Sequence, residues 1–185
     1  PYSASKAACE IAIQSYIKSN LTNHVNLASM RAGNVIGGGD FASNRLMTDL
    51  IKHFQYKKNR KKKLIIRNPN SIRPWQYVLD VVSGYILLAE KLYTNKKFIG
   101  SFNFGPNKNL TKIKVKQIVK EFQKYFDKKG NIIFKDNIVN NKEEEKIFLT
   151  TNKIKKFLKF RNKINTFKNL IRRSIFVYNQ INKTK

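Results

Sequence analysis

The chain has 185 residues, of which 41% are hydrophobic, and this is enough for one compact domain with its own core. The sequence has no run of about 18 apolar, uncharged residues, so no membrane-spanning helix is expected. Its one cysteine, Cys9, cannot form an internal disulfide. We therefore expect a reducing compartment, the cytoplasm, and no membrane partner.

The formal net charge is +27, which is extreme for a chain of this length. Such a charge is typical of proteins that bind nucleic acid or an anionic surface. The excess is mostly lysine and is spread along the sequence, whereas base reading favours arginine. Only residues 57–63, KKNRKKK, form a dense run, which we interpret as a solvated loop or helix end. A basic domain that binds nucleic acid or an anionic surface is kept as the alternative of a different class.

The hydrophobic pattern predicts helices that alternate with short strands along the chain. Helices are expected at residues 1–19, 44–56, 78–94, 114–126, 152–159 and 166–182. Strands are expected at 25–32, 64–67, 101–106 and 130–134, with a glycine-rich loop at 33–40 and a turn at 68–74. This alternation indicates an α/β fold with a parallel sheet, whose first strands we expect upstream of residue 1.

Tyr2 and Lys6 stand four residues apart on the first predicted helix, so both side chains lie on the same helix face. A nearby ammonium lowers the pKa of a phenol, and such a pair can serve as a general base for an alcohol proton. In a lysine-rich chain, a surface tyrosine beside a surface lysine is the simpler interpretation. Small residues between and after the pair favour the functional one, because a flat ligand could approach the helix closely.

The segment PYSASKAACEI, residues 1–11, resembles the catalytic helix of the extended short-chain dehydrogenase/reductase superfamily. The resemblance implies that Tyr2 is the catalytic base. It also implies that Lys6 hydrogen-bonds the nicotinamide ribose of NAD and tunes Tyr2, which makes both residues part of the cofactor site. The chain contains no G-x-x-G-x-x-G segment, so the site for the other half of NAD is expected upstream.

RAGNVIGGGD, residues 31–40, resembles the R-x-x-N-x-x-G segment of superfamily members that act on sugar nucleotides. The resemblance implies that Ala32 and Gly33 lie near the nicotinamide and that Asn34 contacts the substrate diphosphate. Glycines let a backbone approach a ligand and present N–H groups to phosphate oxygens. A plain strand-to-helix turn would explain the same glycines.

NSIRPWQYVLDVVSGYILLAEKLY, residues 70–93, is the most specific stretch and resembles the CDP-glucose 4,6-dehydratases. The resemblance implies a substrate site in which Arg73 binds the diphosphate, Arg45 and Leu46 begin a substrate-binding helix, and Asn103 lines the same pocket. It is strong to residue 106 and collinear to about residue 170. In the last part the family pattern is broken at three positions, which leaves the packing there open: Thr150, Lys159 and Phe160 replace an Asp, a Gly and a Trp.

Other polar or aromatic residues carry weaker signals. Trp75 could shelter the pocket or lie in the core, and Asp40 and Asp80 are expected to brace turns. His24 and His53 have no partner at metal-ligand spacing and are expected on the surface. The acidic cluster at residues 143–145, in which Glu143 could mark a position near the pocket, is interpreted as solvated, and no metal site is expected.

Taken together, the resemblance implies an NAD-dependent lyase that converts CDP-glucose to CDP-4-keto-6-deoxyglucose by oxidation at C4, loss of water and hydride return to C6. The expected fold is the C-terminal part of a Rossmann-like NAD-binding domain at 1–60, with a small α/β substrate-binding domain at 61–185 that interleaves with it. We expect a fragment that is inactive alone and a full-length homodimer. Another nucleotide-sugar epimerase or dehydratase is the closest alternative.

Overall fold

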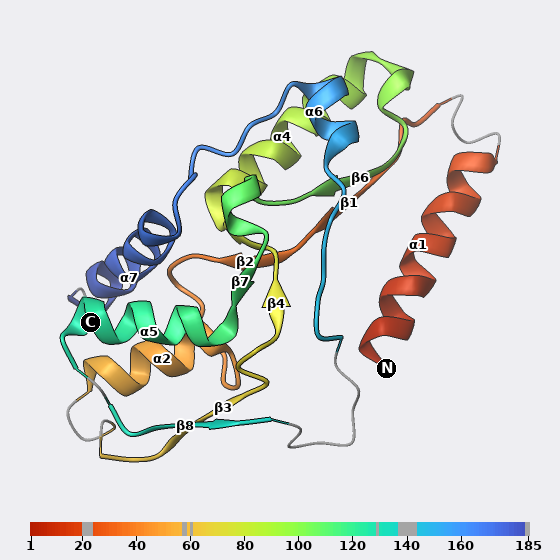
Figure 1. Ribbon diagram of the computed structural model, residues 1–185. Helices are drawn as coiled ribbons and strands as arrows, with labels where there is room; N and C mark the ends of the chain where they lie inside the picture. Colours follow the sequence, from red (N-terminus) through yellow and green to blue (C-terminus); the bar gives the residue numbers. More distant parts are fainter. Residues whose placement is uncertain (20–23, 57–58, 60, 129, 137–143, 184–185) are drawn as a thin grey trace.

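The computed structural model describes residues 1–19, 24–56, 59, 61–128, 130–136 and 144–183 (Figure 1). It confirms an α/β fold of helices and mostly parallel strands. The helices are α1 (Tyr2–Lys18), α2 (Leu46–Gln55), α4 (Val78–Thr94), α5 (Val115–Phe126), α6 (Asn152–Leu158) and α7 (Phe167–Lys183), with short 3-10 turns η2 (Lys96–Phe98) and η3 (Lys108–Leu110).

The strands are β1 (Ala28–Ala32), β2 (Asn34–Ile36), β3 (Leu64–Arg67), β4 (Ile72–Arg73), β5 (Trp75–Tyr77), β6 (Gly100–Phe104), β7 (Ile113–Lys114) and β8 (Ile132–Lys135). They pair two by two. The pairs β1–β6, β2–β5 and β3–β8 are parallel, and β4–β7 is antiparallel. The expected parallel pairing is therefore confirmed in three of the pairs.

Four short strands were not expected from the sequence. β2 lies inside the predicted glycine-rich loop, β4 lies inside the predicted turn, β5 follows that turn directly, and β7 lies at the start of the helix predicted at 114–126. β2 continues the course of β1 after a break at Gly33 and pairs with β5. A strand of two or three residues between glycines and prolines shows no alternation, so only its tertiary partner stabilises it.

The larger hydrophobic core lies where α2, α5 and α7 meet, at the lower left of Figure 1. Each helix contributes a stripe of large apolar side chains at helical spacing, which is the pattern of a helix with one buried face. The fully buried side chains of this core include Leu50, Ile118, Val119, Phe122, Leu170, Ile171, Ile175 and Tyr178. Strands β2, β3 and β5 add Ile36, Ile66, Trp75 and Tyr77.

A second, smaller core joins α4 and α6 to the β1–β6 pair, and it includes Leu88, Phe102 and Phe104. Its edge holds two departures from the family pattern. Lys159 ends α6 in the left-handed region with φ 51°, a conformation that glycine adopts at lower cost. Phe160 packs edge-on against Phe104 with ring centroids 5.8 Å apart, so an aromatic side chain does fill the tryptophan position.

Helix α1 stands apart at the right of Figure 1 and has no buried residue. Polar side chains join it to the β1–β6 pair. Glu10 accepts two hydrogen bonds from Arg31, of which the one from Nε measures 2.8 Å, and another from Ser29 Oγ. Gln14 Nε2 donates to Ser101 Oγ at 3.2 Å. These contacts hold the helix that carries Tyr2 and Lys6.

Several expectations about single residues can now be judged. Asp80 braces the chain as expected, because its carboxylate accepts from the backbone N–H groups of Lys163 and Ile164. His24 is exposed as expected, but the surface assignment of His53 is wrong, since this side chain is buried. His53 lies in the last turn of α2, on its buried face. A single histidine in a sequence does not show whether its side chain is buried, so this burial could not be predicted.

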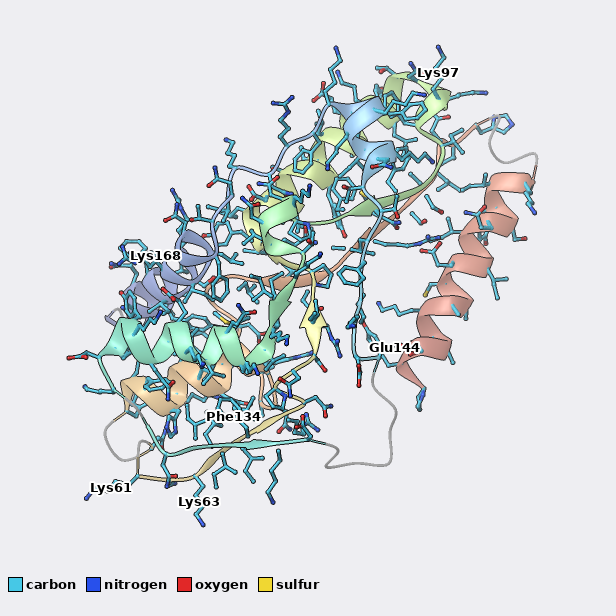
Figure 2. The ribbon with its side chains drawn as sticks, in the orientation of Figure 1. Lys61, Lys63, Lys97, Phe134, Glu144 and Lys168 are labelled. Atoms are coloured by element: carbon cyan, nitrogen blue, oxygen red, sulfur yellow. The ribbon has the colours of Figure 1, made fainter. Side chains whose placement is uncertain are left out.

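Parts of two charged segments lie outside the described residues, namely positions 57, 58 and 60 of the basic run and Glu143 of the acidic cluster. The lysines labelled in Figure 2 lie at separate ends of the molecule, with Lys97 at the top, Lys168 at the left and Lys61 and Lys63 at the bottom. Among the described helices, none has the length and apolar character needed to cross a membrane.

Candidate active site

A large cavity of about 840 Å³ opens between the start of α1, the ends of β1 and β3, the start of α2 and the β4–β5 segment. Its wall is formed by segments that are far apart in the sequence. The residues that line it include Tyr2, Ala32, Gly33, Asn34, Asp40, Arg45, Leu46, Asp49, Arg67, Arg73, Trp75 and Tyr178.

Seven of the nine site residues expected from the sequence line this one cavity. They come from four separate parts of the chain, and they are Tyr2, Ala32, Gly33, Asn34, Arg45, Leu46 and Arg73. Lys6 and Asn103 are the other two, and they are not among its lining residues. The fold therefore brings most of the expected residues together, while their roles stay predictions.

Tyr2 and Lys6 occupy the first turns of α1, as expected. Lys6 Nζ lies 5.7 Å from the centroid of the Tyr2 ring, on the same helix face. The Tyr2 side chain is 74% exposed and reaches the cavity from its rim. The geometry places the Lys6 ammonium over the ring of Tyr2, which lines the cavity, and the role of the pair as a base stays a prediction.

Asn103 lies on β6, away from the cavity lining. Its Nδ2 donates to the carbonyl oxygen of Thr150 at 3.4 Å. This contact links β6 to the segment that leads into α6. In the described structure Asn103 therefore contacts another part of the chain at the edge of the sheet.

Arg45, Arg73 and the start of α2 contribute hydrogen-bond donors to the cavity. Arg45 occupies the N-cap position of α2, and an arginine offers no acceptor to the N–H groups of the first helical turn. Those N–H groups and the helix dipole favour an anion. Arg73 Nη1 donates to the carbonyl oxygens of Ile72 at 3.0 Å and Glu145 at 3.3 Å, and these contacts orient its guanidinium.

Two ionisable residues of the cavity were not anticipated. Arg67 ends β3, and Asp49 lies in the first turn of α2. Burial raises the pKa of Asp49, while Lys52, the backbone N–H of Asn44 and Arg67 act in the opposite direction. The sequence offers one weak signal for Arg67, because it directly precedes the turn that leads to Arg73.

Two glycines of the 33–40 segment allow close packing within the chain. A Cβ at Gly33 would lie 2.6 Å from Pro74 Cγ, and a Cβ at Gly38 would clash with Val177. At these two positions the absence of a side chain lets other parts of the same chain pack closely. The backbone of Gly33 still lines the cavity, so its expected place near a cofactor stays a prediction.

Trp75 is both a core residue and a cavity residue, the two alternatives that the sequence left open. Its side chain is buried in the larger core, and its indole N–H donates to the carbonyl oxygen of Ile113 at 3.3 Å. It also lines the cavity. Because it is the chain's single tryptophan, its fluorescence would report a ligand in that cavity.

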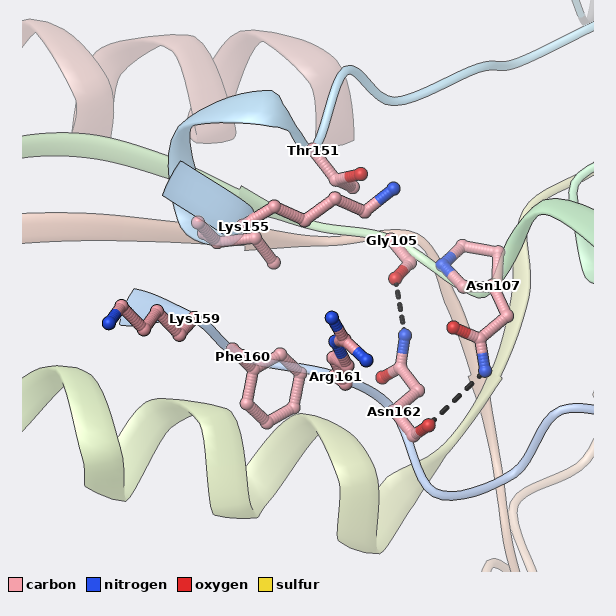
Figure 3. A pocket seen from close by; sticks show the side chains of 10 residues that line it. Gly105, Asn107, Thr151, Lys155, Lys159, Phe160, Arg161 and Asn162 are labelled. Carbon is pink, nitrogen blue, oxygen red and sulfur yellow. Dashed lines mark hydrogen bonds between the residues drawn. The ribbon is translucent and has the colours of Figure 1, made fainter. Parts of the chain in front are cut away.

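A second cavity, of about 370 Å³, lies between the end of β6, α6 and the segment that follows α6 (Figure 3). It holds none of the expected site residues. Asn162 Nδ2 donates to the carbonyl oxygen of Gly105 at 2.8 Å, and Asn107 Nδ2 donates to the carbonyl oxygens of Asn162 and Ile164. These amides hold the chain together, and we assign the active site to the larger cavity.

Comparison with known proteins agrees with this geometry. The model of the NAD dependent epimerase/dehydratase family matches residues 1–105, which cover β1, β2, α2, β4, β5 and the Tyr2–Lys6 helix. The chain belongs to this family. The family is NAD-dependent, and every expected site residue lies within the matched part.

A CDP-glucose 4,6-dehydratase of Salmonella typhimurium (strain LT2) is 49% identical over 113 residues. That match covers 57% of this chain and 30% of the enzyme, so the chain matches less than a third of the relative's length. This relation supports the resemblance seen in the sequence.

Solved structures share the fold at low identity. MoeE5 in complex with UDP-glucuronic acid and NAD superposes with a TM-score of 0.80 at 14% identity, covering 98% of this chain and 56% of that one. A UDP-glucuronic acid 4-epimerase of Bacillus cereus, in complex with UDP-glucuronic acid and NAD, gives 0.80 at 18% identity, covering 98% and 53%. The chain spans about half the length of these structures.

Proposed function

We propose that this chain is part of a CDP-glucose 4,6-dehydratase, a lyase that uses NAD and yields CDP-4-keto-6-deoxyglucose. The observation that carries the proposal is the convergence of seven expected site residues on one cavity. The identity with the Salmonella enzyme supports the choice of dehydratase over epimerase. A volume of about 840 Å³ is within the range of cavities that bind small organic ligands.

The diphosphate of the substrate would lie between Arg73, Arg45 and the start of α2. A guanidinium offers paired donors that suit phosphate oxygens, and the first N–H groups of α2 add further donors. Asn34, on β2, would donate from its side-chain amide to the same group. This assignment gives each of the three side chains a part in binding one doubly charged group.

The sugar would lie at the mouth of the cavity, next to Tyr2. The phenolate oxygen of Tyr2 would take the proton of the C4 hydroxyl, and the Lys6 ammonium beside the ring would stabilise the phenolate. Tyr2, Ala32 and Gly33 line the cavity and Lys6 lies over the Tyr2 ring, so these four residues would hold the nicotinamide end of NAD. When bound there, NAD supplies the acceptor and the donor of a hydride.

Two broader assignments also belong to this proposal. Residues 1–60 would complete a Rossmann-like domain and residues 61–185 would mainly form the substrate-binding domain, in a cytoplasmic enzyme. A homodimer would use the outer face of α1, where the small residues Ala7, Ala8 and Ala12 are exposed together with Ile11. The chain alone would bind the nucleotide sugar without turning it over.

Tryptophan fluorescence of the chain during titration with CDP-glucose tests the proposal. We expect a saturable change from Trp75. The Arg73→Ala variant should bind at least about tenfold more weakly, since a charged hydrogen-bond donor is lost. Arg172→Ala is the matched control, because Arg172 is an exposed residue of α7 outside the cavity.

Arg73 also contacts two backbone carbonyls, so circular dichroism of each variant should accompany the titration. Arg73→Lys keeps the charge without the fork, and it should fall between the wild type and Arg73→Ala. No fluorescence change in the wild type, or equal affinities of folded Arg73→Ala and Arg172→Ala, would contradict the proposed function.

A further inference from the structure

Asp49 and Arg67 form an acceptor and a donor in the same part of the large cavity. Asp49 lies in the first turn of α2, Arg67 ends β3, and these two elements contact each other. Both residues line the cavity. Their charges interact, yet the described chain shows no ion pair between them. A carboxylate and a guanidinium that line one cavity without an ion pair between them offer a ligand one acceptor and one donor.

The remaining bonds of Asp49 leave part of its carboxylate open to a ligand. An ionised carboxylate has two oxygens and can accept about four hydrogen bonds. The described structure assigns it one, from the backbone N–H of Asn44. The other acid in the cavity, Asp40, instead accepts from the N–H of Ala42 at 2.9 Å and so braces its own turn. Asp49 is thus the better placed acceptor.

The position of the pair points to the base of the nucleotide. Under the proposed function the sugar lies at Tyr2 and the diphosphate at Arg73. In Figure 1 the start of α1 stands apart from α2 and β3, with β4 between them. A nucleotide sugar that runs from Tyr2 past Arg73 would therefore place its base by α2 and β3. Ile65 and Val115 also line the cavity and offer apolar contact to a flat ring.

Cytosine and uracil differ in the hydrogen-bonding groups that such a pair can distinguish. Cytosine carries an amino group at C4, which donates, and an unprotonated N3, which accepts. Uracil carries an oxygen at C4, which accepts, and an N3–H, which donates. A carboxylate only accepts and a guanidinium only donates. A carboxylate is also the side chain that suits the cytosine amino group.

We propose that Asp49 and Arg67 select cytosine over uracil, with the Asp49 carboxylate accepting from the C4 amino group and Arg67 donating to N3. This inference rests on the proposed function and adds to it the residues that determine the nucleotide. Uracil would set its O4 against the carboxylate and its N3–H against the guanidinium, and both contacts are unfavourable.

A structural role for Asp49 is the competing explanation. An acid in the first turn of a helix interacts favourably with the helix dipole, and its bond from Asn44 would fix the turn. That role predicts a change in stability when Asp49 is replaced and no change in the preference between bases. The ratio of the two affinities is therefore the readout that separates the two roles.

Calorimetric titration of the chain with CDP and with UDP tests the inference. The wild type should bind CDP about tenfold or more tightly than UDP. In Asp49→Asn, an amide can turn to donate or accept, so the ratio should fall toward one. Arg67→Gln should lower the ratio for the same reason. Asp127→Asn is the matched control, because Asp127 is exposed at the end of α5 outside the cavity lining, and it should keep the wild-type ratio.

The possible results are distinguishable. Equal wild-type affinities for CDP and UDP would overturn the selection of cytosine and leave a nucleotide-diphosphate site standing. A wild-type preference for CDP that is unchanged in folded Asp49→Asn and Arg67→Gln would overturn the assignment to these residues only. Wild-type binding of neither nucleotide would contradict the proposed function together with this inference.

Discussion

Helices α1 and α7 have the same length, 17 residues, and opposite packing. In α7 the side chains of Leu170, Ile171, Ile175 and Tyr178 are fully buried in the larger core. In α1 no residue is buried, and Ile11 is 71% exposed. One helix is held by large apolar side chains at helical spacing, and the other by a few polar contacts to β1 and β6.

The two parts of the proposed reaction site differ in the same way, because one is built on the larger core and the other on α1. The substrate end of the cavity is built on α2, β3 and β5, which share the core with α7. The Tyr2–Lys6 pair is carried by α1, whose position depends on Glu10, Arg31 and their neighbours. We infer that nucleotide binding is preformed in this chain, while the position of the catalytic pair is much less constrained.

The largest expected effect is on the free energy of unfolding, when an isoleucine is replaced by alanine in each of the two helices. Ile171→Ala in α7 removes a fully buried side chain and should lower the free energy of unfolding by about 2–5 kcal/mol. Ile11→Ala in α1 removes an exposed one and should change it by less than about 0.5 kcal/mol. Urea unfolding followed by circular dichroism measures both. Similar losses in the two variants would mean that α1 packs as tightly as α7.

A smaller effect should follow from removing the contact that anchors α1. Glu10→Gln weakens the bidentate contact with Arg31, so amide hydrogen exchange in α1 should speed up while exchange in α7 stays unchanged. Both side chains are partly exposed, so the global free energy of unfolding should change by about 1 kcal/mol or less. Glu90→Gln, which alters the exposed Glu90–Lys91 pair, is the control. Unchanged exchange in α1 would show that Glu10 is not its anchor.

The smallest effect is a pH dependence of the same contact. Hydrogen bonds from Arg31, together with Ser29 and the charge of Arg31, lower the pKa of Glu10 below its usual 4.5, against an opposing effect of burial. Because the pKa in the folded state is the lower one, the stabilisation is complete above pH 4.5 and is lost as the pH falls through the lowered value. Exchange in α1 should therefore accelerate on acidification below pH 4.5, relative to the intrinsic rate, in the wild type and much less in Glu10→Gln. Equal acceleration in both would contradict this origin.

Long, strongly patterned elements could be predicted from the sequence. Helix α4 covers residues 78–94 as expected, because its apolar residues recur at helical spacing. Strand β3 also has the expected bounds. Strands β2, β4, β5 and β7 were missed, since strands of two or three residues depend on partners distant in the sequence. The exposure of α1 was not foreseen either, because alanines mark a close-packed face and a solvent face alike.

The cavity residues also divide into those that the sequence predicted and those that depend on contacts between distant segments. Asn34, Arg45 and Arg73 were found by resemblance of short motifs, and the fold then placed them on one cavity wall. Asp49 and Arg67 were not found, because only the contact between α2 and β3 brings them together. Asn103 was expected in the cavity from its place in a motif, yet β6 carries it to the sheet edge, where it contacts Thr150. Motif position alone does not show which way a strand residue points.

The most direct test of the preformed substrate cavity is hydrogen exchange of the chain with and without CDP-glucose. We expect protection at the start of α2, residues 46–49, and across β4 and β5, residues 72–77, with little change along α1. Protection confined to the lysine-rich surfaces, or none at all, would contradict the assignment of this cavity to a nucleotide sugar.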